Sequence, residues 1–218
     1  MSLDSTSLAH LRRIYENRPI AWETLPQEPL VEFRRWLELA LAVEAYEPNA
    51  MVIATANREG RPSARIVLLK GLDERGLIFF TNRESRKGQE LKENPFASVV
   101  FYWPSLQRQV CLRGAVEPLE EELAHAYFRS RPREHQLASW ASRQSTPIPM
   151  DRSFLETRLQ EVAERFRNQE VPPPPYWGGY RVIPDTVEFW QGRPNRLHDR
   201  FRYTRLPSGN WQLERLAP

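Results

Sequence analysis

"MVIATANREGRPSARIVLLKGLDERGLIFFTN" (residues 51–82) decides the fold, because its apolar residues come in short β-branched and aromatic runs with the period of β-strands. The runs are separated by the turn signals "REGRP" and "DERG". Two further runs, "ASVVFYW" (97–103) and "RQVCLRGAVEPL" (108–119), repeat the pattern. Five strands with tight connections predict an antiparallel meander that curls into a barrel.

Helical periodicity surrounds these strands. The stretch "PLVEFRRWLELALAVEAYEP" (29–48) begins with a proline suited to a first helical turn and carries one apolar stripe. Further helices are expected at residues 5–16, 86–93, 120–131, 134–142 and 153–168, and further strands at 178–192, 198–205 and 211–218. The sequence therefore predicts an α+β protein with a mainly antiparallel β-barrel core and helices packed outside it.

Composition limits the class of protein. The 218 residues suit one domain, and 31 basic against 28 acidic residues leave a net charge of +3, so bulk attraction to nucleic acid is not indicated. The single cysteine, Cys111, rules out an intrachain disulfide, and its apolar surroundings predict a buried side chain rather than a nucleophile. No apolar run reaches the ~18 residues of a membrane span. We expect a soluble, cytoplasmic protein that binds neither nucleic acid nor membrane.

The start of the expected 86–93 helix breaks the usual charge rule. Ser85 is a suitable N-cap, and Arg86 and Lys87 then occupy a first turn where the helix dipole is already positive. Cations there become favourable when an anion binds to the free N–H groups of the turn. The sequence thus indicates a phosphate site, with a solvated pair of basic residues as the alternative.

Two more basic segments surround apolar runs. Arg65 and Lys70 bracket a strand, and their odd separation places them on opposite faces. Tyr127 and Arg131 lie one helical turn apart and can converge on one ligand, with His135 just beyond. Arginine is suited to a bidentate grip on phosphate, although an arginine-rich exposed helix end is the common alternative.

The segment "EFWQGRPNRLHDRFRY" (188–203) carries the last basic cluster. If it is extended, Arg196, His198 and Arg200 share one face of a strand. The chain lacks a Gly-rich phosphate loop, a dinucleotide-binding glycine motif and the ligand spacing of a metal site. The residues alone therefore predict a β-barrel protein that binds one or two small phosphorylated molecules.

Taken together and in order, these motifs resemble the pyridoxamine 5'-phosphate oxidase family. The matching stretches are "RIVLLK" (65–70), "FFTNRESRK" (79–87), "QRQV" (107–110), "YFRSRPR" (127–133), "SRQS" (142–145), "VPPPPYWGGYRV" (171–182) and "EFWQGRPNRLHDRF" (188–201). The resemblance implies an FMN-binding split β-barrel that oxidises pyridoxamine or pyridoxine 5'-phosphate to pyridoxal 5'-phosphate, with O2 as acceptor and H2O2 as product. It also implies a homodimer with FMN sites at the subunit interface, a mobile segment over residues 1–28, and C-terminal strands over 172–218 that complete the site.

Site residues carry over by matching position. The flavin contacts are Arg65, Ile66, Val67, Leu68, Leu69, Lys70, Phe80, Thr81, Arg86, Lys87, Gln109, Gln144, Ser145, Trp190 and Arg200. The substrate contacts are Arg12, Tyr15, Lys70, Tyr127, Arg131, His135, Arg196, Leu197 and His198. Arg196 and His198 are the catalytic candidates. The first acts by charge, because a guanidinium stays protonated, and the second either moves a proton or positions the ring.

Two positions depart from the resembled family. It usually has serine where this chain has His135, and it often has tyrosine where this chain has Phe80. The first change affects the substrate-phosphate contacts directly. The alternatives to an oxidase are another split-barrel flavin or deazaflavin reductase, a haem-handling split-barrel protein, a non-catalytic carrier or sensor of pyridoxal phosphate or flavin, and a small nucleic-acid-binding barrel.

Overall fold

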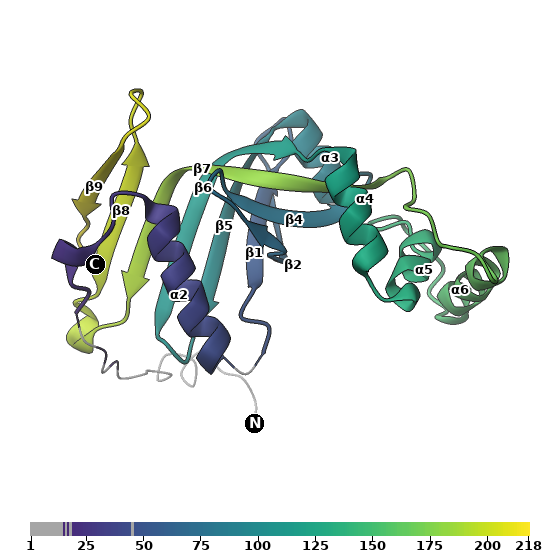
Figure 1. The fold of residues 1–218 in the computed structure, drawn as a ribbon, viewed down its shortest axis with the longest axis horizontal. Coiled ribbons are helices and arrows are strands. Elements are labelled where there is room, and N and C mark those ends of the chain that lie inside the picture. Colours follow the sequence, from purple (N-terminus) through teal and green to yellow (C-terminus); the bar gives the residue numbers. More distant parts are fainter. Residues whose placement is uncertain (1–14, 16, 18, 45) are drawn as a thin grey trace. The chain divides into compact units, whose positions relative to one another are not determined.

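The computed structural model describes residues 15, 17, 19–44 and 46–218, so the helix expected at 5–16 lies outside the described residues apart from Tyr15. The strands are β1 (Ala50–Ala56), β2 (Pro62–Leu68), β3 (Gly71–Leu72), β4 (Leu77–Asn82), β5 (Phe96–Trp103), β6 (Arg108–Pro118), β7 (Trp177–Gln191), β8 (Asp199–Arg205) and β9 (Trp211–Arg215). They form one sheet in the order β2-β1-β5-β6-β7-β4-β3, with β8 paired to β7 and β9 to β8 (Figure 1).

Helices connect and cover these strands. They are η1 (Trp22–Thr24), α2 (Pro29–Val43), α3 (Arg86–Glu93), α4 (Glu121–Ser130), α5 (Arg133–Ala141), α6 (Ser153–Arg165) and η2 (Pro194–Arg196). The predicted α+β class is confirmed, and α3 has the bounds that its sequence predicts. No helix among the described residues is both long and apolar enough to cross a bilayer.

The predicted meander is wrong at β4, which does not pair with the next strand. β4 instead pairs antiparallel with the first part of β7, from Leu77 opposite Val182 to Asn82 opposite Trp177. The last part of β7 pairs with β8. Pro184 lies between the two paired segments, and because proline has no N–H to donate, it suits the interval between two ladders.

The chain divides into two compact units. Unit 1 contains the described part of residues 1–48 with 100–112 and 186–218, and unit 2 contains 49–99 and 113–185. In unit 1, α2 buries its apolar stripe against strand residues. The ring of Phe33 lies 5.0 Å from that of Phe101, and the ring of Trp36 lies 5.1 Å from that of Phe189. These contacts anchor α2 to β5 and to the last part of β7.

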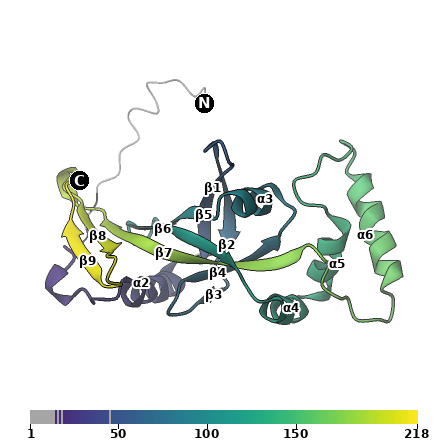
Figure 2. The same cartoon turned by 90° about the horizontal axis from the view of Figure 1, so that it is seen from above.

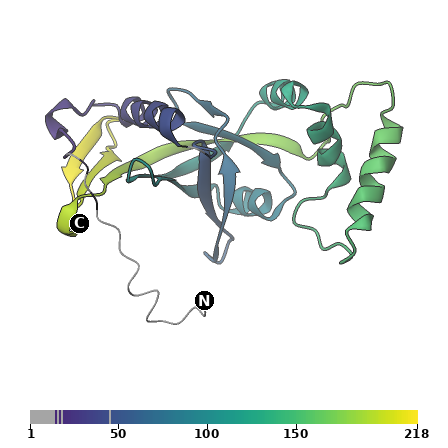
Figure 3. The ribbon, with the colours of Figure 1, turned by 90° about the horizontal axis from the view of Figure 1, so that it is seen from below.

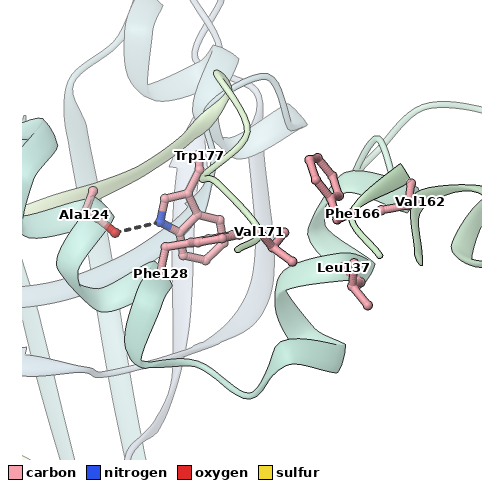
Figure 4. Packing of buried hydrophobic residues seen from close by; sticks show 7 residues of the cluster. All are labelled: Ala124, Phe128, Leu137, Val162, Phe166, Val171 and Trp177. Atoms are coloured by element: carbon pink, nitrogen blue, oxygen red, sulfur yellow. Dashed lines mark hydrogen bonds between the residues drawn. The ribbon is translucent and has the colours of Figure 1, made fainter. Parts of the chain in front are cut away.

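Unit 2 has a second apolar cluster, made by α4, α5, α6 and the start of β7 (Figure 4). The indole N–H of Trp177 donates to the carbonyl of Ala124 at 3.0 Å, and Phe128 packs edge-on against the same indole at 5.3 Å. Figures 2 and 3 show α5 and α6 side by side. This packing fixes the ends of α4 and α5, where Arg131 and His135 lie.

Candidate functional site

The first turn of α3 holds a buried ammonium group. Ser85 caps the helix by accepting from the N–H of Gly88, and Lys87 is only 5% exposed. Lys87 Nζ donates to Thr81 Oγ1 at 2.9 Å and to Gln144 Oε1 at 3.0 Å. Among the described residues it has no carboxylate partner. Burial lowers the pKa of Lys87 to about 8, and the charge of Arg65 contributes to the decrease.

A buried carboxylate on the same helix, Glu90, was missed by the sequence analysis. Glu90 is buried and accepts from Arg86 Nε at 2.9 Å, from Arg65 at 3.3 Å and from Ser63 at 2.6 Å. Burial raises the pKa of Glu90, but these hydrogen bonds and one from Thr55 outweigh it and lower the pKa to about 2. The sequence signal that could have identified Glu90 is its position four residues after Arg86, where the two side chains face each other on a helix.

Glu90 distinguishes Lys87 from Arg65 and Arg86, two other predicted flavin contacts. Arg65 and Arg86 are both paired with Glu90, whereas Lys87 keeps a buried charge near the open N–H groups of the helix start. A buried charge is unfavourable without a counter-charge. This donor set therefore suits a phosphate anion, with Lys87 as its principal cation.

The remaining residues of the predicted flavin stretch, 66–70, form the end of β2 and the two residues after it. Ile66 is 67% exposed, Val67 and Leu68 are half-buried, and Leu69 is buried. The strand ends at Leu68, so the alternation predicted to place Arg65 and Lys70 on opposite faces does not extend to Lys70. Lys70 is exposed, and its backbone N–H donates to the carbonyl of Ile78 at 2.8 Å.

A cavity of about 360 Å³ joins predicted flavin and substrate residues in unit 2. Its lining includes Phe80, Thr81, Asn82, Arg131, His135, Ser139, Gln144, Tyr176 and Trp177. The guanidinium of Arg131 lies 4.6 Å from the centre of the Trp177 indole and donates to Ser139 Oγ at 2.8 Å. Burial lowers the pKa of Arg131 while Tyr127 opposes the shift. The cavity thus presents a pre-oriented guanidinium in the same lining as Thr81 and Gln144, two of the three hydrogen-bond partners of Lys87 in the described part of the chain.

Tyr127 and Ser145 border this region in different ways. The Tyr127 ring stacks on Phe80 with centroids 4.0 Å apart and an angle of 11° between planes. Ser145 is exposed, has a φ of 70°, and lines a second cavity of about 570 Å³ formed by the 141–148 loop and α6. Ser145 therefore lines the second cavity. The 360 Å³ cavity brings together five of the predicted residues, Phe80, Thr81, Arg131, His135 and Gln144.

The other predicted flavin residues lie in unit 1. Trp190 on β7 pairs in register with Arg200 on β8. Arg200 Nε donates to Glu188 Oε1 at 2.8 Å, and its Nη1 donates to the carbonyl of Ala217 at 2.9 Å. Glu188 lies on β7, two residues before Trp190, and orients the guanidinium of Arg200. It was not predicted as a site residue from the sequence.

Gln109 lies beside the single cysteine of the chain. Its amide donates to Cys111 Sγ at 3.3 Å. Burial and the nearby Glu188 raise the pKa of Cys111 to about 11, against the opposing effects of Gln109 and Arg200. Cys111 is half-buried, so the predicted full burial is wrong, but a raised pKa favours the thiol at neutral pH, as expected of a residue that is not a nucleophile.

The interpretation that Arg196, His198 and Arg200 share a strand face is wrong. β8 begins only at Asp199, and Arg196 ends the short helix η2. Asn195 and Arg196 have φ values of 57° and 62°, so the chain turns through two left-handed residues and strand alternation does not apply. Arg196 and Leu197 are exposed.

His198, in contrast, packs into an aromatic corner. Its ring lies 4.7 Å from that of Trp190 and 5.4 Å, edge-on, from that of Tyr15. The structure therefore brings together Tyr15, Trp190 and His198, all predicted to contact flavin or substrate. Arg12, predicted as a substrate contact, lies outside the described residues.

Similarity to known proteins covers nearly the whole chain. The family model "Pyridoxamine 5'-phosphate oxidase" matches residues 32–166, and the model "Pyridoxine 5'-phosphate oxidase C-terminal dimerisation region" matches residues 177–218. A Nostoc punctiforme protein named pyridoxine/pyridoxamine 5'-phosphate oxidase is 49% identical over 216 residues, which are 99% of this chain and 100% of that protein.

Solved structures agree with this similarity. PhzG from Burkholderia lata, crystallised with tetrahydrophenazine-1-carboxylic acid, is 34% identical with a TM-score of 0.87, over 94% of this chain and 100% of that one. An FMN-binding, pyridoxamine 5'-phosphate oxidase-related protein from Nostoc punctiforme shares the fold at 18% identity and a TM-score of 0.70, over 89% and 100%. The predicted split-barrel fold is confirmed, and the chain belongs to the pyridoxamine 5'-phosphate oxidase family.

Proposed function

We propose that the chain is an FMN-dependent oxidase that converts pyridoxamine 5'-phosphate or pyridoxine 5'-phosphate to pyridoxal 5'-phosphate, with O2 as acceptor and H2O2 as product. The observation that carries the proposal is the cavity whose lining includes Arg131 and His135 together with Thr81 and Gln144, two of the three hydrogen-bond partners of buried Lys87 among the described residues. Two separate cationic groups suit two phosphates. The similarity to named oxidases at 49% identity supports the same activity.

The residues of the chain divide this work by their chemistry. Lys87 and the start of α3 suit the phosphate of FMN, and Arg131 suits the phosphate of the substrate. When bound, FMN supplies the acceptor for the hydride of the exocyclic carbon and passes the electrons to dioxygen. Arg196 contributes a constant positive charge, because its guanidinium does not lose its proton. Its side chain also covers the substrate.

The assembly that follows is a homodimer with each FMN between two subunits. The predicted flavin residues fall into two sets, with Lys87 and Gln144 in unit 2 and Gln109, Trp190 and Arg200 in unit 1. The matched dimerisation region, 177–218, contains Trp190 and Arg200. We propose that unit 2 of one subunit and unit 1 of its partner form one site. The 218 residues act as one functional domain, and the first 28 residues close over the substrate through Arg12 and Tyr15.

Oxygen consumption tests the activity. The purified protein should show flavin absorption and should consume one O2 and release one H2O2 for each pyridoxal 5'-phosphate formed from either phosphorylated substrate. Tetrahydrophenazine-1-carboxylic acid, the molecule bound in the PhzG structure, serves as the comparison substrate. Turnover of that acid without turnover of the pyridoxine compounds would contradict the proposed substrate class.

Glu188→Gln tests how Arg200 is held. The variant loses the charge that orients the Arg200 guanidinium, so the Kd for FMN should rise about 10-fold, as expected for one charge-assisted hydrogen bond. Glu214→Gln is the matched control, because Glu214 also pairs with an arginine across neighbouring strands, at 3.0 Å. Fluorescence titration of the apoproteins with FMN measures both. Equal affinities for the two variants would contradict a role for Glu188.

A further inference from the structure

The carboxylate of Glu90 joins α3 to the first two strands. Its side chain is only 6% exposed, although it carries a charge. Oε1 accepts from Arg86 Nε at 2.9 Å, within the helix. Oε2 accepts from the hydroxyl of Thr55 on β1 and, at 2.6 Å, from the hydroxyl of Ser63 on β2. One side chain therefore ties the helix that carries Lys87 to both strands of the β1–β2 hairpin.

The same two hydroxyls determine where the guanidinium of Arg65 lies. Thr55 and Ser63 are opposite each other in the β1–β2 register, and Arg65 is two residues further along β2. Arg65 Nη1 donates to Thr55 Oγ1 at 2.6 Å. Its Nη2 donates to Ser63 Oγ and, at 3.3 Å, to Glu90. A hydroxyl has one proton, and because each of these donates it to the carboxylate, each oxygen is left as an acceptor for Arg65.

Glu90 holds the second arginine, Arg86, at its Nε atom. The side chain of Arg86 is 66% exposed, against 22% for Arg65. A guanidinium engaged at Nε keeps its two terminal nitrogens, which can form a fork with phosphate oxygens. A side chain that is already held also loses less rotamer freedom when a ligand binds. Glu90 therefore orients an exposed arginine for an anion.

The charges of this cluster match those of a phosphate monoester. At pH 7, Arg65, Arg86 and Lys87 carry three positive charges and Glu90 carries one negative charge, so two positive charges remain. Burial raises the pKa of Glu90, but its hydrogen bonds lower it to about 2, so the carboxylate is ionised at neutral pH. A phosphate monoester carries about −1.5 to −2 charges at pH 7. The carboxylate thus compensates one cation and leaves enough positive charge for the phosphate.

We infer that Glu90 is a positioning residue for the phosphate of FMN, because it holds Arg65 and Arg86 in the orientation that grips the phosphate and fixes α3 on the β1–β2 hairpin. The inference rests on the proposed function, which assigns the FMN phosphate to the start of α3. Lys87 remains the principal cation. Glu90 acts through its two arginine partners and does not touch the flavin.

Comparison of FMN with riboflavin tests this role, because riboflavin lacks the phosphate. Glu90→Gln keeps the shape of the side chain, but a neutral amide offers one acceptor oxygen where the carboxylate has two. The Kd of the apoprotein for FMN should rise about 10-fold, as expected for the loss of one charge-assisted hydrogen bond. The Kd for riboflavin should not change. Fluorescence titration with each flavin measures both values.

The alternatives predict different results for the same variant. If Glu90 only stabilises the fold, both affinities should fall together. If the carboxylate mainly repels the phosphate, FMN should bind Glu90→Gln more tightly than it binds the unmodified chain. Either result, or an unchanged Kd for FMN, would overturn the inference.

Two further variants complete the test. Glu93→Gln is the matched control, because Glu93 is the exposed last residue of the same helix, and both of its affinities should match those of the unmodified chain. Ser63→Ala leaves every charge in place and removes one hydroxyl between Arg65 and Glu90. Its Kd for FMN should rise about 3-fold with riboflavin unaffected, and this result decides the question if Glu90→Gln does not fold.

Failure of the inference differs from failure of the proposed function. An unmodified apoprotein that binds riboflavin as tightly as FMN would refute the phosphate site at α3. A normal preference for FMN that neither Glu90→Gln nor Ser63→Ala reduces would refute only the role of Glu90.

Discussion

Lys87→Met should produce a folded protein that purifies without FMN. The substitution keeps the length of the buried side chain and removes the only positive group at the start of α3 that lacks a carboxylate partner among the described residues. One charge-assisted hydrogen bond contributes roughly 1.5–3 kcal/mol, so loss of the ammonium proposed to face the phosphate should weaken FMN binding about 100-fold. Flavin absorbance of the purified protein, relative to protein concentration, measures the effect.

The same variant should not weaken the apoprotein. The pKa of Lys87 is about 8 in the folded chain and about 10.5 unfolded, so keeping it charged at pH 7 costs the fold on the order of 3 kcal/mol. The unfolded chain binds the proton more tightly, and this cost therefore decreases as pH rises from about 8 to about 10.5. Unmodified apoprotein should gain stability over that range, and Lys87→Met should show no such gain in urea denaturation.

Lys92→Met is the matched control, because Lys92 is an exposed lysine in the last turn of the same helix. It should keep normal FMN content and the pH dependence of the unmodified chain. Normal flavin content in Lys87→Met would contradict the assignment of the FMN phosphate to α3. A Lys87→Met apoprotein that is unfolded would contradict the stability argument instead.

Arg131→Met should raise KM for pyridoxine 5'-phosphate about 100-fold, because it removes a guanidinium already oriented by Trp177 and Ser139 at the cavity wall. FMN content should stay normal, since Lys87 is held by hydrogen bonds to Thr81 and Gln144 and not by this residue. Steady-state oxygen consumption gives KM and kcat separately. The substrate without its phosphate, pyridoxine, should be oxidised equally poorly by the variant and the unmodified protein.

Arg129→Met supplies the comparison for Arg131. Arg129 lies two residues away, is exposed and pairs with Glu122 at 2.9 Å. Its replacement should leave KM unchanged. A selective loss of activity toward unphosphorylated pyridoxine in Arg131→Met would place the guanidinium at the ring rather than at the phosphate.

Local signals in the sequence predicted local structure well. Ser85 followed by two basic residues predicted both the start of α3 and its positive first turn, because capping depends on neighbouring residues. The strands were also recognised from their period. The pairing of β4 with β7 was not, because it joins segments about 100 residues apart through contacts that no local pattern records.

The site was predicted less completely than the fold. The matched positions Thr81, Gln144 and Arg131 do meet at one cavity. The role of Glu90 was missed because an acidic residue four positions after Arg86 reads as an ordinary surface pair until its burial is known. The strand interpretation of Arg196 was wrong because two left-handed residues after Pro194 are not recognisable from alternation.

A hybrid dimer tests most directly whether each site is built from two subunits. One chain carries Lys87→Met and a first affinity tag, the other carries Arg200→Ala and a second tag, and tandem purification isolates the hybrid. If unit 2 of one subunit and unit 1 of its partner form each site, one site of the hybrid carries both substitutions and the other carries none. We therefore expect about one FMN per hybrid dimer, against about two for the unmodified dimer and close to none for either variant alone. A hybrid dimer without FMN would show that each site lies within a single chain and would contradict the account.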